Sequence, residues 1–310
     1  METNFLERLH REVLVAWMPM QTFLVEEYGK PMEEHLSVWV LDHPEAFQDA
    51  LRRSYASGCD MGHAAVQASS PFRSKPFGKS VRDRIYELNY KSAKLAKEVT
   101  PQDCYVVGNI SHSNPDFLEP LGNMTYNEVY EGYKLQISAL VEGGVDVLHI
   151  SGNHIDEGII AIKVAKDICD LPIMGHNVFY VGKTGFKSMM GHNPKESASR
   201  FQEAGADVFG TNCGLMTKST DSSEWYPAAT SLVKEMRLGC DIPLCIMPDP
   251  GMPRLVNDKT VWPASPEEMA SEVLNWVDAG ARVIGGCCGT NLEHYRSISE
   301  ILKQKGLKNS

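Results

Sequence analysis

The sequence lacks the features that mark several large classes of protein. Its 310 residues contain no apolar stretch long enough to span a membrane. The first ten residues place Glu2, Glu7 and Arg8 where a secretory signal needs an apolar run. The 30 lysines and arginines are scattered along a chain of formal net charge -10, unlike the clustered basic surface of a nucleic-acid-binding protein. We therefore expect a cytoplasmic protein that binds neither membranes nor nucleic acids.

The eight cysteines include no CxxC pair and do not have the spacing of a disulfide scaffold. In a chain of this length they favour metal or catalytic use in a reducing compartment, which again predicts the cytoplasm. Five of them lie in or beside apolar segments and are expected to be core residues: Cys59, Cys104, Cys169, Cys240 and Cys245.

The other three cysteines stand beside glycines at the ends of apolar runs. Cys287 and Cys288 lie in the run Gly-Gly-Cys-Cys-Gly-Thr at 285–290, and Cys213 lies in Gly-Thr-Asn-Cys-Gly at 210–214. Adjacent residues of a strand face opposite ways, so both members of the pair can turn inward only where the strand ends. Three thiolates predict a zinc site whose fourth position is free for water or substrate. The alternative is that all three are small buried residues.

Helices and strands alternate along the chain. Four segments share the end of an amphipathic helix, a glycine suited to a left-handed cap and the start of an apolar strand: 54–60, 140–146, 201–207 and 276–282. Eight apolar runs are the expected strands: 13–17, 60–66, 105–110, 145–150, 171–174, 208–213, 242–247 and 282–288. Strands that are apolar on both faces and separated by helices predict an α/β fold, a single (β/α)8 TIM-type barrel over residues 1–310. Its active site is expected at the carboxyl ends of the strands.

With these motifs, and with Leu-Val-Glu-Gly-Gly-Val-Asp at 140–146, the chain resembles the homocysteine S-methyltransferase family. That family includes the N-terminal homocysteine-binding module of cobalamin-dependent methionine synthase and betaine homocysteine methyltransferase. The resemblance implies a barrel that holds zinc through Cys213, Cys287 and Cys288, with Asn212 at the position of the asparagine before the first ligand. It also implies methyl exchange with cobalamin. The chain has no DxHxxG stretch for cobalamin, so a corrinoid protein acting in trans is the expected partner.

The sequence departs from the family pattern where the family carries acidic residues. Trp-Met-Pro-Met-Gln-Thr at 17–22 replaces a turn that begins with Asp, and His-Ala-Ala at 63–65 replaces Glu-Thr-Asn. Ile-Ser-Gly at 150–152 replaces Ile-Glu-Thr. In the family the lost acids help to bind the amino group of homocysteine, and a buried ammonium without a counter-charge is costly. A substrate other than homocysteine is therefore expected. The aromatic and apolar surface of Trp17, Met18 and Met20 suits a methoxylated, methylthio or methylammonium compound more than an amino acid.

Neutral polar and aromatic side chains near the expected strand ends are the candidates for the rest of the site. The candidate catalytic residues, as proton carriers or hydrogen-bond donors, are His63, His149 and His176. The candidate substrate-binding residues are Trp17, Met20, Asn153, Asn177, Asn212 and Asp249. For each histidine the alternative is a core or loop residue, for Trp17 and Met20 it is packing, and for Asp249 it is a turn before proline.

Together these features predict a zinc-dependent methyltransferase that moves a methyl group between a small methylated substrate and a corrinoid protein. Three thiolates on a divalent cation can hold a substrate thiol as thiolate at neutral pH, and in-line methyl transfer needs alignment of donor and acceptor. One alternative is an S-methyltransferase that forms a thioether from homocysteine or another thiol. A second is a zinc-binding homologue without turnover.

Overall fold

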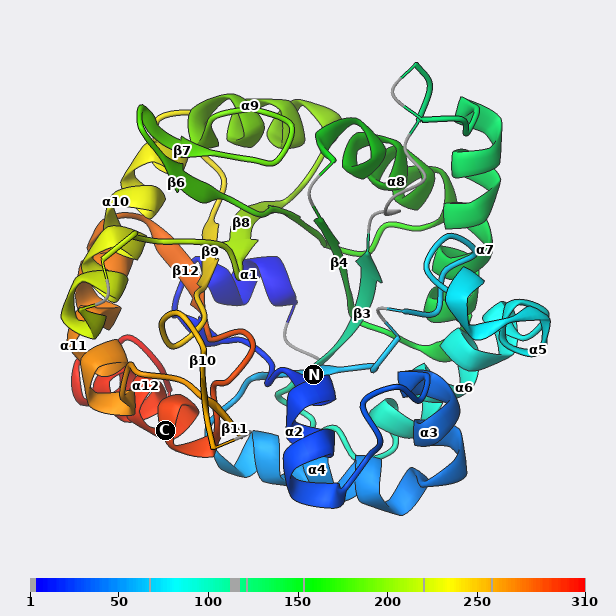
Figure 1. The fold of residues 1–310 in the computed structure, drawn as a ribbon, viewed down its shortest axis with the longest axis horizontal. Helices are drawn as coiled ribbons and strands as arrows, with labels where there is room; N and C mark the ends of the chain where they lie inside the picture. Colours follow the sequence, from blue (N-terminus) through cyan, green and yellow to red (C-terminus); the bar gives the residue numbers. More distant parts are fainter. Residues whose placement is uncertain are drawn as a thin grey trace.

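A computed structural model of the chain describes residues 4–66, 68–111, 118–120, 122–152, 154–219, 221–257 and 259–309 (Figure 1). No helix in these ranges is long and apolar enough to cross a membrane.

Eight parallel strands form one sheet, in the order β1-β12-β9-β8-β5-β4-β3-β2. They are β1 Leu14–Val15, β2 Met61–His63, β3 Tyr105–Ser111, β4 Val147–Gly152, β5 Ile173–Asn177, β8 Val208–Asn212, β9 Leu244–Met247 and β12 Ala281–Ile284. The first and last strands of this order meet where the backbone N–H of Asp60 donates to the carbonyl oxygen of Val15 at 2.8 Å. All eight predicted strands are present, and the predicted barrel is confirmed.

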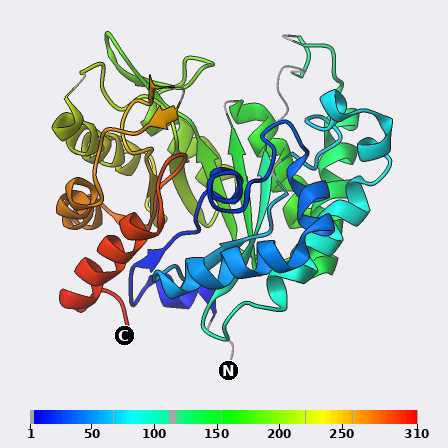
Figure 2. The same ribbon diagram turned by 60° about the horizontal axis from the view of Figure 1, so that its bottom comes forward.

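Helices surround this barrel (Figures 1 and 2). The outer helices are α4 Pro44–Ala56, α6 Ile85–Lys97, α7 Tyr126–Gly143, α8 Ile155–Ile168, α9 Pro194–Ala204, α10 Trp225–Arg237, α11 Pro266–Asp278 and α12 Leu292–Gln304. Their buried faces pack on the outside of the strands, where side chains such as Phe201, Phe209 and Trp276 are fully buried. Burying apolar area between the two layers is the main source of stability in such a fold.

Two features recur where a repeated segment joins a helix to the next strand: a glycine with positive φ, and in three of the four segments an aspartate. Their glycines, Gly58, Gly144, Gly205 and Gly280, all have φ between 90° and 111°, as predicted for left-handed caps. Three of the four segments end in aspartate, whose backbone N–H and carboxylate both bond one residue of the neighbouring strand. The pairs are Asp60 with Val15, Asp146 with Val106, and Asp207 with Ile173. These bonds bind neighbouring strands together at the amino end of the barrel.

The amino end of the barrel is closed by helix α1 (Phe5–Leu9). Phe5 and Leu9 are buried in the same apolar cluster as Leu14, Met61 and Val283, which point into the barrel from its strands. The ring of Phe5 meets Tyr105 edge-on, with centroids 5.3 Å apart. The interior of the barrel is therefore filled at its amino end, and the site is expected at the carboxyl end.

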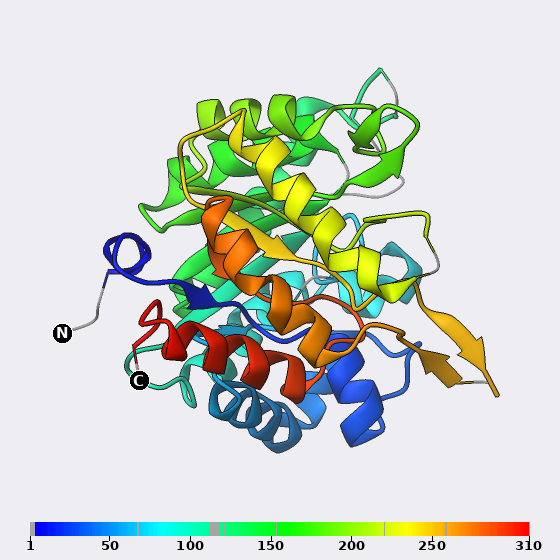
Figure 3. The ribbon, with the colours of Figure 1, turned by 90° about the vertical axis from the view of Figure 1, so that its left-hand side faces the viewer.

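Short helices and two hairpins lie at the carboxyl end of the strands. They are α2 Met20–Tyr28, α3 Leu36–Asp42, η1 Lys75–Phe77, α5 Lys79–Arg82, η2 Ser222–Glu224 and two hairpins, β6 Tyr180–Gly182 with β7 Gly185–Lys187 and β10 Arg254–Val256 with β11 Lys259–Val261. The β10–β11 hairpin projects from the barrel (Figure 3), and its Leu255 is 74 % exposed.

Candidate metal centre and adjoining cavity

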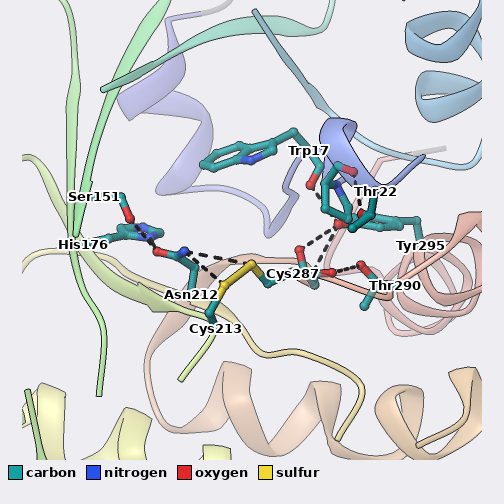
Figure 4. The surroundings of a disulfide bond; sticks show 11 residues. Trp17, Thr22, Ser151, His176, Asn212, Cys213, Cys287, Thr290 and Tyr295 are labelled. Atoms are coloured by element: carbon teal, nitrogen blue, oxygen red, sulfur yellow. Dashed lines mark hydrogen bonds between the residues drawn. A yellow bond between two sulfur atoms is a disulfide. The ribbon is translucent and has the colours of Figure 1, made fainter. Parts of the chain in front are cut away.

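The three singled-out cysteines meet at the carboxyl end of the barrel. Cys213 directly follows β8, and Cys287 and Cys288 follow β12 (Figure 4). One ligand atom from each of these cysteines and one carboxylate oxygen of Asp249, which follows β9, all lie within 4.8 Å of one another. Residues more than 70 positions apart in the sequence thus supply a single cluster of sulfur and oxygen donors.

The sulfur atoms of Cys213 and Cys287 are joined as a disulfide, while Cys288 is a free thiol. The spacing of the cysteines in the sequence does not predict this bond. A disulfide and a thiolate metal site are two redox states of the same atoms, because a metal binds the thiolate form of cysteine. Zinc binding at this cluster therefore requires the reduced protein.

The backbone around the cysteines is fixed by hydrogen bonds from neighbouring strands. The N–H of Cys213 donates to Met247 at 3.1 Å, and the N–H of Cys287 donates to the carbonyl oxygen of Pro248 at the same distance. Cys213 itself has φ 55°, a left-handed conformation that costs a residue other than glycine about 1 kcal/mol or more. Such strain at a position held from both sides is common at functional sites.

Glycine is required beside the cysteine pair for a physical reason. Gly289 has φ 82°, and a Cβ atom at this position would lie 2.2 Å from the indole of Trp262. The preceding turn is tied to the first strand by Tyr295, whose hydroxyl lies 2.8 Å from the carbonyl oxygen of Trp17 and 2.9 Å from that of Gly286. The motif of glycines and cysteines therefore encodes a closely packed turn as well as two members of the cysteine cluster.

Asn212 presents its amide group to the sulfurs. Its Oδ1 accepts a hydrogen bond from the hydroxyl of Ser151 at 2.8 Å and lies 3.3 Å from Nδ1 of His176. Its Nδ2 is consequently turned toward the sulfur atoms, at 3.6 Å from Cys213 and 3.9 Å from Cys287 (Figure 4). Hydrogen-bond donors at this position stabilise negative charge on sulfur.

The donor set fits zinc. Zinc–sulfur bonds of about 2.3 Å in a tetrahedron place two sulfurs about 3.8 Å apart, a spacing that the 4.8 Å span of the four ligand atoms accommodates.

Burial raises the pKa of the Cys288 thiol to about 11, and the nearby Asp249 carboxylate adds to the rise. Burial also raises the pKa of Asp249 to about 8, although the backbone N–H of Cys288 opposes this. A divalent cation reverses such shifts, because it favours the charged form of each ligand.

A cavity of about 260 Å³ opens beside the cluster. The predicted residues on its wall are Trp17, Met20, His63, His149, Asn212, Cys213, Cys287 and Cys288. Among the described residues that line it, none is Asp or Glu, and Arg73 is the one residue with a permanent charge. Arg73 has no ion-pair partner in the part of the chain that the structure describes.

His63 is held as a neutral donor that faces the cavity. Its Nδ1 accepts the backbone N–H of Ala65 at 2.7 Å, so the proton of the neutral ring is on Nε2. Burial lowers the pKa of His63 to about 4, so the ring is uncharged at neutral pH. Ala65 adopts φ 56° to make this bond.

His149 and His176 pack with Trp17 inside the barrel. The ring centroids of Trp17 and His149 are 4.7 Å apart, and those of His149 and His176 are 4.2 Å apart. His176 is fully buried and lies outside the cavity wall, and burial lowers its pKa to about 3. Its contact with Asn212 makes it a residue that orients a neighbour of the sulfurs.

Three other predicted residues have different placements. Asn177 points away from the cavity, because its Nδ2 donates to Ser197 of α9 at 3.3 Å. Asp249 belongs to the sulfur cluster and is not on the cavity wall. Asn153 lies outside the described residues.

Three residues that line the cavity are not among the predicted site residues: Ser151, Asn109 and Arg73. Asn109 lies on β3 and Ser151 lies on the neighbouring strand β4. In this strand pair Asn109 is opposite His149, and Ser111 is opposite Ser151. A polar residue near the end of an apolar strand is the signal that could have marked them. Arg73 lies in an irregular segment and carries no such signal.

Comparison with known proteins identifies a family that covers most of the chain. The model of the homocysteine S-methyltransferase family matches residues 18–302. Methionine synthase of Mycobacterium leprae is 23 % identical over 96 % of this chain, and methionine synthase of Mycobacterium tuberculosis is 23 % identical over 71 % of it. The chain spans about a quarter and about a fifth of the length of these relatives, at 25 % and 18 %.

Solved structures share the fold. The homocysteine methyltransferase MmuM from Escherichia coli in its metallated form aligns with a TM-score of 0.73 and 18 % identity, covering 93 % of this chain and 96 % of that one. Its oxidised form aligns with a TM-score of 0.71 and 15 % identity over 93 % and 95 % of the two chains. A methyltransferase from Methanosarcina mazei aligns with a TM-score of 0.59 and 13 % identity over 98 % of both chains.

Proposed function

The chain belongs to the homocysteine S-methyltransferase family, and on this premise we propose that it is a zinc-dependent methyltransferase. It moves a methyl group between a small methylated substrate and a corrinoid protein acting in trans. The observation that carries the proposal is the convergence of Cys213, Cys287 and Cys288 beside an open cavity at the carboxyl end of the barrel. Sites of this fold are built at that end.

Cys213, Cys287 and Cys288 would hold the zinc in the reduced protein. When bound, the ion supplies Lewis acidity toward a sulfur or oxygen atom of the substrate, which it holds in its anionic form or prepares as a leaving group. The amide of Asn212 donates to the sulfurs of Cys213 and Cys287. These hydrogen bonds would reduce the electron density that the two sulfurs give to the metal. Ser151 keeps that amide from rotating.

The cavity favours a substrate without an ammonium group. It has no carboxylate among its described lining residues, whereas Arg73 is a fixed cation on its wall. Burying an ammonium beside Arg73 would bring two like charges together, and no described residue of the cavity wall supplies a carboxylate to compensate them. A methoxy or methylthio compound that is neutral or carries an anionic group is therefore the substrate class that we propose.

The side chains of the cavity position such a substrate. Trp17 offers an aromatic face, and His63 presents an uncharged Nε2–H group. The N–H group of a neutral imidazole can donate a hydrogen bond to an ether oxygen, a thioether sulfur or a carboxylate oxygen. While Nε2 carries its proton, it has no free lone pair that could accept the methyl group. Both side chains would hold the methyl group in line for transfer, which is the larger part of catalysis for a displacement reaction.

The corrinoid partner is proposed from the resemblance to cobalamin-dependent methionine synthase, in which the homocysteine-binding module exchanges a methyl group with cobalamin. Methionine synthases are among the relatives of this chain. The competing function is an S-methyltransferase that converts homocysteine to a thioether. It is favoured by the likeness to MmuM, a homocysteine methyltransferase, and opposed by the absence of an acid on the described cavity wall.

A methyl-transfer screen tests the proposal. Reduced, zinc-loaded protein is incubated with aryl methyl ethers, methylthio compounds, methylated amines or homocysteine, each with and without a reduced corrinoid protein, and methylcobalt formation is followed by absorbance. We expect a methoxy or methylthio compound to methylate the corrinoid protein, and chelation of zinc to stop the transfer. Thioether formation from homocysteine without the corrinoid protein would establish the competitor, and transfer that survives complete zinc removal would overturn both.

A further inference from the structure

Arg73 is a cation on the cavity wall that no described residue neutralises. It is the one residue with a permanent charge among the described residues that line the cavity. It forms no ion pair within the described part of the chain. The surrounding protein lowers the pKa of Arg73 through burial of its guanidinium group, and a bound anion would oppose this cost.

The turn that carries Arg73 is packed against the barrel on both sides of this residue. The backbone N–H of Arg73 donates to Oγ of Ser70 at 3.1 Å, and the N–H of Ser74 donates to the carbonyl oxygen of Ser70 at the same distance. Phe72 is buried and meets Tyr133 of α7 edge-on, with ring centroids 5.2 Å apart. Ser74 is fully buried. The backbone of Arg73 is therefore fixed, while its side chain keeps exposed surface on the cavity wall.

The rest of the wall is neutral, and part of it is polar without a partner. Asn109 lines the cavity and is only 7 % exposed. Its Oδ1 is buried and makes no hydrogen bond with any described residue, which is rare and costly in a folded protein. An unsatisfied amide beside an unpaired cation indicates a wall built for a polar group of a ligand, in addition to an apolar methyl group.

One small molecule can meet Arg73 and the sulfur cluster at the same time. Both Arg73 and the three cysteines line a single cavity of about 260 Å³. This volume is slightly smaller than the roughly 300–1,000 Å³ of pockets that hold drug-sized ligands. The cavity therefore suits a compact substrate with an anionic end and a methyl-bearing end.

We propose that Arg73 binds a carboxylate group of the substrate, which is then a small methoxy or methylthio carboxylic acid; this deepens the proposed function and rests on it. The parallel N–H donors of a guanidinium match the two oxygens of a carboxylate, and hydrogen bonds between charged groups are the stronger kind. One cation on the wall balances one negative charge, which favours a carboxylate over a doubly charged phosphate. Anchoring the carboxylate at Arg73 leaves the methyl-bearing end of the substrate for the sulfur cluster.

Calorimetric binding to the reduced, unaltered chain tests this assignment without a variant. The probes are two matched pairs of an acid and its neutral amide, 4-methoxybenzoate with 4-methoxybenzamide and 4-(methylthio)benzoate with 4-(methylthio)benzamide. We expect at least one acid to bind about 10-fold or more tightly than its amide. Equal affinity within both pairs, or no binding of either acid at millimolar concentration, would overturn the assignment.

Two variants locate the charge that reads the acid. In Arg73→Gln the Kd for the acid should rise by about 10-fold or more, while the Kd for the amide stays within about 2-fold, which also shows that the cavity is intact. Arg82→Gln is the matched control, since Arg82 is an exposed arginine of the same connection that does not line the cavity. It should keep the preference for the acid. Retention of that preference in Arg73→Gln would overturn the role of Arg73.

Titrations with and without zinc separate Arg73 from the metal as the carboxylate site. We expect the preference for the acid to persist in the reduced, zinc-free chain, and a preference that disappears with zinc would place the carboxylate on the metal and overturn the assignment. The outcome is also separable from that of the proposed function. Acids that bind through Arg73 but methylate no corrinoid protein would count against the transfer reaction alone. Transfer from a neutral methyl ether as efficient as from the matched acid would count against Arg73 alone.

Discussion

At the scale of single residues, Asn212 presents one fixed face of its amide group to the sulfurs of Cys213 and Cys287. Ser151 and His176 fix its oxygen, which leaves its Nδ2 group to face Cys213 and Cys287. The amide therefore donates to sulfur and never accepts from it. An aspartate of the same size would place an oxygen there and repel the sulfurs.

The Asn212→Asp variant should lose about 10- to 100-fold in zinc affinity and in methyl transfer, because outer donors to metal ligands have effects of this size. Chelator competition and the transfer assay measure the two quantities. Thr211→Val is the matched control, since Thr211 is the buried neighbour on the same strand and is not on the cavity wall. Equal zinc affinity in Asn212→Asp and Thr211→Val would contradict the assigned role of the amide.

His63 makes a prediction for stability against pH. Its pKa in the folded protein is about 4, lowered by burial from an ordinary value of about 6.5. Between these values the unfolded chain binds a proton that the folded chain does not, so the free energy of unfolding falls as the pH falls from about 6.5 to about 4. The contribution of His63 over this window is roughly 2–3 kcal/mol.

Urea unfolding of the unaltered chain and of His63→Gln across this pH range measures that contribution. The variant should show a shallower fall in the free energy of unfolding, whatever its absolute stability. Parallel curves for the two proteins would show that His63 titrates alike in both states, contrary to its burial. His176, whose pKa burial also lowers, accounts for part of the slope that remains.

The candidate metal ligands are easier to predict from the sequence than the residues around them. The convergence of Cys213, Cys287 and Cys288 could be predicted because flanking glycines and strand ends are visible in the sequence itself. The direction in which the Asn177 side chain points could not be predicted from the sequence. It depends on the register of the strands in the barrel, which decides which face of a strand end meets the cavity. The place of Asp249 among the sulfurs depends likewise on β9 lying between β8 and β12.

At the scale of elements, the repeated helix ends were predictable and their aspartates were not. A glycine after an amphipathic helix has a local cause in the left-handed cap, whereas Asp60, Asp146 and Asp207 act on a neighbouring strand. Each carboxylate accepts the N–H of a residue 34 to 45 positions away. Only the parallel pairing of the strands brings these groups together.

Removing one of these carboxylates should loosen the amino end of the barrel. In Asp146→Ala the N–H of Val106 and the ammonium of Lys97, at 2.7 Å and 2.6 Å from the carboxylate, both lose their partner. We expect a loss of about 1–3 kcal/mol in the free energy of unfolding, with zinc affinity unchanged. Asp170→Ala, at an exposed position, should change stability by less than about 0.5 kcal/mol. A loss no larger in Asp146→Ala would contradict the strand-bridging role.

The short hairpins β6–β7 and β10–β11 could not be predicted from hydrophobic patterning. Each of their strands has three residues, too few to show a period. Their positions over the carboxyl end of the barrel are set by the strands that precede them.

At the scale of the whole molecule, the barrel brings distant parts of the chain to one end. Helix α1 closes the amino end, so the cavity and the donor cluster share the carboxyl end. The order of strands places β8, β9 and β12 side by side, and these three supply every member of the cluster. The predicted fold class thus accounts for the meeting of the ligands, and the family match is consistent with it.

Zinc K-edge X-ray absorption of the reduced, zinc-loaded chain is the most direct test of the central claim that three cysteines hold one catalytic ion. We expect one zinc per chain with three sulfur neighbours at about 2.3 Å and one lighter ligand. In Cys287→Ala the sulfur count or the zinc itself should be lost. A zinc ion with fewer than two sulfur neighbours in the unaltered chain, or a chain that does not bind zinc after full reduction, would contradict the account.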